Sequence, residues 1–271
     1  MTGRRRGTLI ATAWLRRVVM LALIAALIGT LRNVGLLDSE RLVRAARNLA
    51  IFAAGLFPPD PSTLPTLGAA MIETIQIAFA GTAIGFALAL PLALLACPVL
   101  FGPSITGSVK LLLAVVRTVP ALFWAIVFVV AVGFGPAAGT LAIALYSLGY
   151  LGKLLYETFE GVDPEVVEAV RSVGCSRAQL ARYVLLPEAA NGILALLLFM
   201  FEYNVRASSI MGFVGAGGIG FYLLGYIQLL RYDLLLSGLL LTLAVVIVID
   251  RVSALVRRMF LIPVTSPAPA E

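Results

Sequence analysis

The sequence predicts an all-α, polytopic membrane protein with about six transmembrane helices. Of its 271 residues, 61% are hydrophobic and only 13% are charged, and the mean hydropathy is +1.03. Charged residues are absent from stretches long enough to cross a bilayer, which takes about 20 apolar residues per helix. A water-soluble globular protein is therefore excluded.

The charge balance and the lack of histidine exclude further classes of function. Lys and Arg number 20 against 14 Asp and Glu, an excess that membrane topology explains without nucleic acid as a partner. Cys97 and Cys175 lie far apart and outside any metal-ligand spacing, and the chain contains no histidine. We therefore expect no disulfide scaffold, no histidine-based catalysis and no metal site.

Residues 1–63 are predicted to hold a basic tail, a first transmembrane helix and an amphipathic helix on the membrane surface. The tail contains Arg4 to Arg6, which suit contact with anionic lipid. The apolar run from Val18 to Leu31 reaches spanning length with its flanks; a signal peptide is the alternative, but no cleavage site of small residues follows the run. From Ser39 to Leu56, apolar residues recur at helical spacing, with arginines on another face. The proline cluster from Pro58 to Pro61 then ends this helix.

Residues 64–260 are predicted to form the main transmembrane domain, followed by a tail at residues 261–271. Turns are expected from Cys97 to Gly107 and from Gly133 to Pro136, because both stretches are rich in glycine and proline. A glycine-rich segment before the last helix is expected not to span the membrane. The spans of this domain are predicted within the uncharged stretches at residues 74–109, 118–152, 189–201 and 234–249.

Lysine and arginine near the ends of the spans predict the orientation, because these residues are enriched on the cytoplasmic side. With the N-terminus inside, fourteen of them lie on the cytoplasmic side and six on the other. Both termini and the loop at residues 160–187 are therefore predicted to be cytoplasmic.

This loop is predicted to contain two short helices that meet at Gly174. Asp163 is expected to cap the first helix, with Pro164 as its first residue and Glu165 in its positive first turn. Gly174 suits the left-handed position that ends such a helix.

The second helix of the loop is predicted from Ser176 and Gln179, which have the spacing of a capping box. Pro187 is expected to interrupt this helix where the chain re-enters the membrane. An inert connector is the alternative, but a connector has no need of two capped helices.

Residues in the loop match the loop shared by the membrane subunits of binding-protein-dependent ABC importers. The match consists of Glu168-Ala169, then Gly174, and then Val184-Leu185-Leu186-Pro187. Val184 stands where that family usually has isoleucine, and Val170 where it often has alanine. The resemblance implies that the first helix of the loop couples the chain to an ATPase. The residues implied in this coupling are Asp163, Pro164, Glu165, Glu168, Ala169, Gly174, Val184, Leu186 and Pro187.

Three further segments resemble the phosphonate importer permease: Arg117 to Trp124, Ser147 to Leu154 and Glu202 to Gly220. The resemblance covers most of the chain after Leu64. It implies the type I ABC importer permease fold, with a MetI-like transmembrane domain and a glycine-rich insert in the outer leaflet.

The same resemblance implies a transport subunit of the bacterial inner membrane and not an enzyme. In that family, two permease copies form a homodimer, two cytoplasmic ATPases bind ATP and Mg, and an extracytoplasmic binding protein delivers the substrate. The chain has no phosphate-binding loop of the G-x-x-x-x-G-K-[ST] type, so we expect ATP hydrolysis to come from a partner and no cofactor in this chain.

The expected substrate is a phosphonate or a related small phosphorus oxyanion. The alternative is another small solute of related importers, such as methionine, phosphate or phosphite. A membrane enzyme acting on lipid is disfavoured by the absence of histidine, clustered carboxylates and a nucleophile motif. A secondary transporter needs intramembrane carboxylates and internal symmetry, and the sequence shows no convincing repeat.

Glu202 and Arg206 are candidate pathway residues, four positions apart on one helical face. With a rise of about 1.5 Å per residue from Pro187, Arg206 lies about 28 Å along, near the outer boundary. Arg206 there either meets a phosphorus oxyanion or pairs with Glu202 to hold the outer end of the span. The polar residues that add hydrogen bonds to either arrangement are Asn204, Ser208 and Ser209.

Five glycines between Gly212 and Gly220 permit close approach and unusual backbone angles. Non-helical backbone at membrane depth survives only where protein or a water-filled cavity covers it. The segment is therefore predicted to be a half-penetrating element at the outer mouth, and tight helix packing without a gate is the alternative. The candidate residues of this element are Met211, Phe213, Val214, Gly217 and Gly218.

Overall fold

The computed structural model describes the backbone of residues 3–260 and the side chains from Trp14 onward. Within that range every regular element is a helix, and the chain divides into two units, with the boundary between Phe57 and Pro58. Five helical segments of the described range are long and apolar enough to span a membrane, or six if one bent pair counts as a span. The predicted all-α membrane class is therefore confirmed. The predicted tail at residues 261–271 lies outside the described residues.

The first unit consists of α1 (Gly3–Asn33) and α2 (Ser39–Gly55). Residues Trp14–Asn33 of α1 have the length and hydropathy of a membrane span, and none of this stretch is buried. The carboxylate of Asp38 accepts hydrogen bonds from two backbone N–H groups in the first turn of α2, which satisfies donors that have no partner within the helix. The first span and the amphipathic segment are thus confirmed as helices, and the surface location of α2 stays a prediction.

The second unit is built around α3 (Leu64–Leu95) and α6 (Pro136–Glu160), which share the most extensive helix–helix contact in the described part of the chain. Small residues allow the two helices to approach, because a side chain on Gly81 would overlap Ile143. The other long helices of this unit are α4 (Pro103–Thr118), α5 (Ala121–Val132), α9 (Leu186–Met211), α10 (Ile219–Gln228) and α11 (Tyr232–Phe260).

The third span differs from the prediction. We expected it to follow Arg117, but the helix that carries this arginine begins at Pro103 and ends at Thr118. The chain then turns at Pro120, which lacks the N–H needed to continue a helix, and α5 leaves at 84° to α4. The predicted turn before α6 is present, because Gly133 ends α5 with φ +91°. A proline break therefore divides the part of the chain expected to form the third span into two separate helices.

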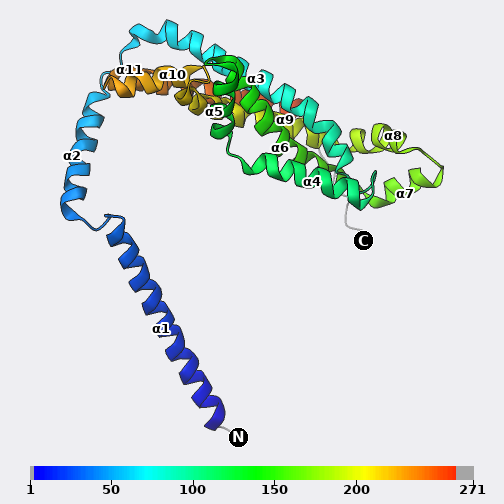
Figure 1. The fold of residues 1–271 in the computed structure, drawn as a ribbon, viewed down its shortest axis with the longest axis horizontal. Helices are drawn as coiled ribbons and strands as arrows, with labels where there is room; N and C mark the ends of the chain where they lie inside the picture. The colour runs from blue at the N-terminus through cyan, green and yellow to red at the C-terminus, as the bar shows by residue number, and fades with distance from the viewer. Residues whose placement is uncertain (1–2, 261–271) are drawn as a thin grey trace. The chain divides into compact units, whose positions relative to one another are not determined.

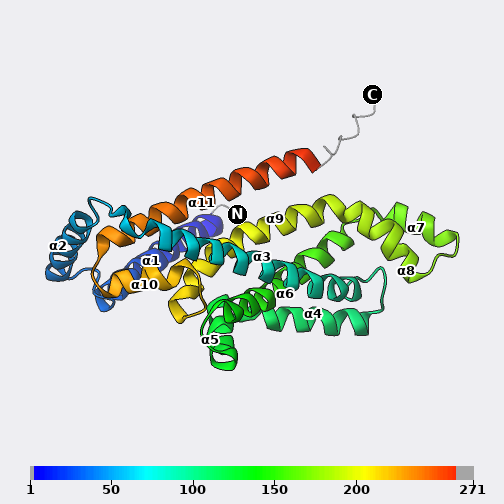
Figure 2. The same cartoon turned by 90° about the horizontal axis from the view of Figure 1, so that it is seen from above.

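The elements of the second unit place the candidate functional residues at opposite ends. α7 (Pro164–Ser172) and α8 (Arg177–Leu180) form the two helices of the 160–187 loop. Figures 1 and 2 show these helices together at one end of α3, α6 and α9, while α10 and the start of α11 lie at the other end.

The connection from the loop into the membrane corrects a second prediction. Pro187 was expected to interrupt the second helix of the loop, but α8 continues through one π-helical turn, Ala181–Leu185, directly into α9. Pro187 follows this π-helical turn directly, near the start of α9. The loop is therefore joined to the span by continuous helical backbone.

Candidate functional site

The predicted caps of the 160–187 loop are confirmed. The carboxylate of Asp163 accepts a hydrogen bond of 2.9 Å from the N–H of Glu165 at the start of α7. The Ser176 hydroxyl accepts from the N–H of Gln179 at 3.3 Å, and the Gln179 side chain accepts from the N–H of Ser176 at 2.8 Å, which is a reciprocal capping box. Gly174 has φ +81°, a conformation that glycine adopts without steric cost.

The loop has one buried face and one exposed face. Val167, Leu180, Val184 and Leu185 are buried in a core that they share with the neighbouring ends of α3 and α6. Leu186 is half-buried beside them. The remaining coupling candidates are exposed, which leaves them free to meet a partner: Asp163, Pro164, Glu165, Glu168, Ala169, Gly174 and Pro187.

The three segments that carry the phosphonate-permease resemblance meet inside the bundle. Asn204 on α9 is fully buried, and its side-chain amide donates hydrogen bonds of 2.8 Å to the hydroxyls of Thr82 on α3 and Ser147 on α6. Gly149, two residues further along α6, lies against the backbone of Arg117 at the end of α4. Asn204 is thus placed between helices and stabilises their packing.

Stacked tyrosines extend from this buried contact toward the surface. The ring centroid of Tyr146 lies 4.7 Å from that of Tyr150 and 5.7 Å from that of Tyr203. The guanidinium carbon of Arg117 lies 5.8 Å from the centre of the Tyr150 ring. Tyr146 is buried whereas Tyr203 is exposed, so the stack links the bundle interior to the exposed face of α9.

Glu202 and Arg206 do not pair with each other, so that interpretation was wrong. Arg257 donates a hydrogen bond of 3.0 Å to Glu202, and Arg206 lies 3.5 Å from Asp250. Both partners belong to α11, which packs against α9. The Glu202 side chain is only 12% exposed, whereas those of Arg206 and Asp250 are 46% and 47% exposed. Glu202 and Arg206 therefore form ion pairs with charged residues of the neighbouring helix α11, and not with each other.

Arg206 lines an open pocket with a volume of about 250 Å³, together with Tyr203, Met211 and apolar residues of α5 and α9. Ser208 and Ser209, predicted to assist Arg206, are buried elsewhere in the bundle. The Ser208 hydroxyl donates to the carbonyl of a residue in α3, and the Ser209 hydroxyl donates within α9. The pocket therefore contains Arg206 without the predicted serines.

The glycine-rich segment packs against the N-terminal half of α3. The N–H of Gly218 donates to the carboxylate of Glu73 at 2.8 Å, and the N–H of Ile219 donates to the hydroxyl of Thr74 at 2.8 Å. These acceptors satisfy donors at the N-terminus of α10, which lack partners within their own helix. Gly217 and Gly218 have φ +84° and +75°, so residues with side chains are disfavoured at both positions.

The three apolar candidates for a constriction lie in different surroundings. Met211 is buried, Val214 is half-buried and Phe213 is exposed. Phe213 and Val214 line an open pocket beside α10, whereas Met211 lines the pocket at Arg206. Met211 thus lines a different pocket from Phe213 and Val214, and the part of these residues in a gate stays a prediction.

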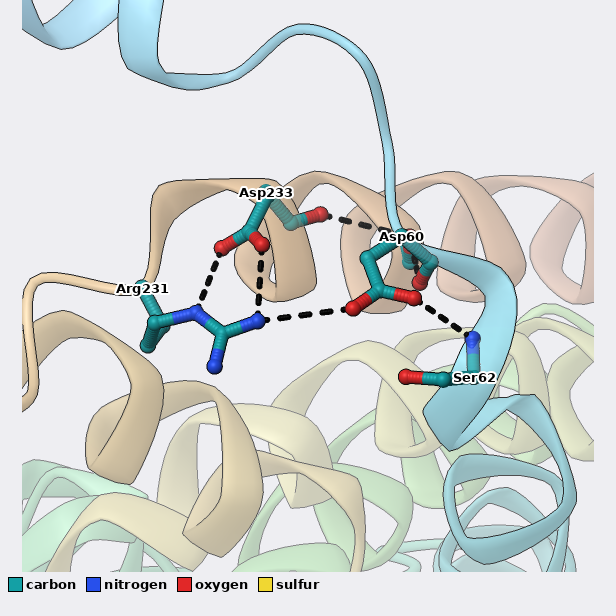
Figure 3. Close-up of polar contacts among 5 residues, drawn as sticks. Asp60, Ser62, Arg231 and Asp233 are labelled. Atoms are coloured by element: carbon teal, nitrogen blue, oxygen red, sulfur yellow. Dashed lines mark hydrogen bonds and ion pairs between the residues drawn. The ribbon is translucent and has the colours of Figure 1, made fainter.

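Figure 3 shows a network of hydrogen bonds and ion pairs between the residues before α3 and the start of α11. Arg231 donates to the carboxylate of Asp233 at 3.0 and 2.8 Å and to that of Asp60 at 3.4 Å. The Ser237 hydroxyl donates to the carbonyl of Asp60 at 2.7 Å. The N–H of Ser62 donates to the Asp60 carboxylate and holds the pKa of this group below its usual value. In the described residues no cluster of acidic residues and cysteines is arranged to hold a metal ion.

Comparison with known proteins identifies the family. Residues 81–260, more than half of the chain, match the family described as binding-protein-dependent transport system inner membrane component. The chain belongs to this family. The permease is 38% identical over 228 residues to the phosphite transport system permease protein PtxC of Stutzerimonas stutzeri, which covers 84% of the chain and 83% of that protein. It is also 37% identical over 209 residues to the phosphate-import permease protein PhnE of Mycolicibacterium smegmatis, which covers 74% of the chain and 38% of that longer protein.

Solved structures share the fold of the permease. A chain of the inward-facing MetNI methionine ABC transporter superposes with a TM-score of 0.65 at 23% identity, covering 74% of this chain and 98% of that one. The predicted type I ABC importer permease fold is therefore confirmed. The protein is a transport component of the inner membrane and not itself an enzyme.

The charges on α11 that pair with Glu202 and Arg206 of α9 were not predicted from the sequence. Asp250 and Arg257 are seven residues apart, two helical turns, and so lie on one face of α11. Glu202 and Arg206 share a face of α9 in the same way. The spacing shows from the sequence that each helix has a charged face. It does not show that these two faces meet, because that requires knowing that α9 and α11 are neighbours. Thr74, the hydroxyl acceptor for α10, gave no such signal.

Proposed function

We propose that this permease forms the translocation pathway for phosphite, phosphonates or a related small phosphorus oxyanion. The observation that carries the proposal is the 38% identity to a phosphite transport permease over 84% of the chain. The sequence identity of 23% to a chain of a methionine transporter supports the fold alone and says nothing about the substrate. Phosphorus oxyanions are therefore favoured over methionine.

The pocket at Arg206 supports this substrate class. A guanidinium presents a planar fork of donors that suits phosphorus oxyanions. Asp250 lies 3.5 Å from Arg206, longer than the roughly 2.7–2.9 Å of a strong charge-assisted bond, so an anion can compete for the guanidinium. The volume of about 250 Å³ accommodates a small oxyanion with several waters, since a water occupies about 30 Å³ in the liquid.

The proposal includes a division of labour between subunits. Two copies of the permease form the pathway, two cytoplasmic ATPases bind ATP and Mg, and an extracytoplasmic binding protein delivers the oxyanion. The exposed residues of α7 form the docking surface for an ATPase, and the helical connection from α8 into α9 leads from this surface toward Arg206. Both termini are cytoplasmic, as the distribution of Lys and Arg indicates.

The test of the substrate is uptake into proteoliposomes that contain the permease with its ATPase and binding protein. We expect ATP-dependent accumulation of radiolabelled phosphite or methylphosphonate, and no accumulation of methionine. Arg206→Gln should lower uptake about tenfold or more, since a hydrogen bond to a charged group contributes about 1.5–3 kcal/mol, while the purified complex keeps its composition. Arg44→Gln is the matched control, because Arg44 is exposed and pairs only with Glu40 of α2 in the described structure. Uptake of methionine in place of the oxyanions would overturn the proposal.

The test of the topology is labelling of Asn48→Cys in a variant without Cys97 and Cys175. An impermeant thiol reagent added outside intact cells should modify this cysteine, because α2 is proposed to be extracytoplasmic. Modification only after the membrane is opened would reverse the orientation.

A further inference from the structure

The turn between α3 and α4, residues 96–102, is tied to both helices of the 160–187 loop. The guanidinium of Arg171, near the end of α7, donates a hydrogen bond to the carbonyl oxygen of Val99. Arg177, at the start of α8, holds its guanidinium carbon 5.5 Å from the ring centre of Phe101, within the range of a cation–π interaction. Two arginines therefore hold the α3–α4 turn from either side of Gly174.

A shared apolar core supports the two polar contacts. Cys97 and Leu100 of the α3–α4 turn are 0% and 4% exposed, and they belong to the same core as Val167 of α7 and Leu180 of α8. Any separation of the loop from the turn would expose these side chains to water or to the membrane interface. The turn and the loop are therefore expected to move together.

The helix that follows the turn is also tied to the start of the loop. Lys110 on α4 forms an ion pair of 2.6 Å with Glu160, the last residue of α6. The ammonium group of Lys110 also lies 4.7 Å from the ring centre of Tyr156. Thus α4 contacts the chain directly before α7 begins, in addition to the contacts that the turn makes.

We propose that the α3–α4 turn is a second coupling element, and that Arg171 and Arg177 are its positioning residues. The inference rests on the proposed docking of an ATPase at α7. We call the contacts of Arg171 with Val99 and of Arg177 with Phe101 the clamp. α7 is flanked by turns at both ends, so without the clamp a movement of the ATPase would tilt α7 while the membrane spans stayed in place. With the clamp, a displacement of α7 moves the end of α3 and the start of α4 together, while α8 passes the same displacement into α9.

The first experiment measures coupling in the reconstituted complex of permease, ATPase and binding protein. The variant Arg171→Gln/Arg177→Gln should retain normal amounts of bound ATPase but hydrolyse about fivefold more ATP per phosphite ion imported, the lower end of typical coupling effects. Replacing Arg171→Gln by Arg171→Lys in the double variant keeps a charged donor at this position, and it should restore part of the coupling that the double variant loses. The control is Arg182→Gln, because Arg182 belongs to the same loop but lies over the ring of Tyr183, not over the turn.

The second experiment uses the unaltered clamp, so it does not depend on the folding of the double variant. Spin labels are placed on Val173, directly after α7, and Ser104 at the start of α4, and a second pair on Val173 and Val130 of α5; all three positions are exposed. When the complex is changed from the nucleotide-free to the ATP-trapped state, the distance from 173 to 104 should stay constant while that from 173 to 130 changes. Equal changes in both distances would show that α7 moves independently of the turn.

The outcomes separate the inference from the proposed function. If the unmodified complex neither binds an ATPase nor couples hydrolysis to phosphite uptake, the proposed function is wrong. If the unmodified complex is coupled and the double variant is equally well coupled, the inference is wrong and the proposed function stands. A raised ATP-to-phosphite ratio with an unchanged subunit composition, absent from Arg182→Gln, supports the inference.

Discussion

Substitution of Gly174 isolates the cost of the left-handed turn between α7 and α8. Gly174 has φ +81°, and a Cβ atom added to it would meet no atom within 4 Å. The penalty therefore comes from backbone conformation alone, about 1–2 kcal/mol for an L-residue. A gain of about 0.4–1 kcal/mol from the stiffer unfolded chain offsets part of it, which leaves about 1 kcal/mol for Gly174→Ala.

The order of the variants follows from the same argument. Asparagine tolerates the left-handed region because its short polar side chain bonds to the local backbone, so Gly174→Asn should cost least. Valine is β-branched and should cost most, on the order of 2 kcal/mol. The expected order of loop stability is Gly, Asn, Ala and then Val.

Limited digestion with trypsin measures this order, because Arg171 and Arg177 flank Gly174 and are exposed. When the loop opens and closes faster than trypsin cuts, the cleavage rate follows the open population. Since 1.4 kcal/mol corresponds to tenfold, Gly174→Ala should be cleaved about fivefold faster than the native permease and Gly174→Val about thirtyfold faster.

Gly161→Ala is the matched control in the same loop. Gly161 has φ −80°, and an added Cβ would meet its neighbours only at 3.5 Å, an ordinary contact. Its cleavage rate should equal that of the native permease. If Gly174→Val and Gly174→Asn are both cut at the native rate, the left-handed turn does not control the loop and the reasoning is refuted.

Three other outcomes follow from the structure. Burial raises the pKa of the Cys97 thiol, so at neutral pH a permeant maleimide should label the partly exposed Cys175 at least about tenfold faster; equal labelling measured by mass spectrometry would contradict the burial. Arg257→Met should lower the melting temperature by removing about 2 kcal/mol from a partly buried charged hydrogen bond, and the added Glu202→Gln should recover most of the loss; no recovery would rule out this pairing. A methyl group on Gly220 would overlap a backbone carbonyl of α9, so Gly220→Ala should abolish the folded peak in size-exclusion chromatography, whereas a native profile would contradict the close approach.

Local features of the loop were predictable from the sequence, because their partners lie close along the chain. The Asp163 cap, the left-handed Gly174 and the reciprocal bonds of Ser176 and Gln179 each involve residues no more than three positions apart. Their geometry follows from backbone stereochemistry and side-chain type. The membrane class followed equally directly from uncharged stretches of spanning length.

The pairing of charges and the closure of the glycine-rich segment depended on tertiary structure. Spacing alone placed Glu202 beside Arg206, but each found its partner on α11, about 50 residues away in sequence, because helix packing brings those charges opposite. In the same way Gly218 reaches Glu73 across 145 positions. A hydrogen bond or ion pair forms with whichever group the packing of apolar faces brings within reach, and periodicity identifies the face of a helix without identifying the helix that will cover it.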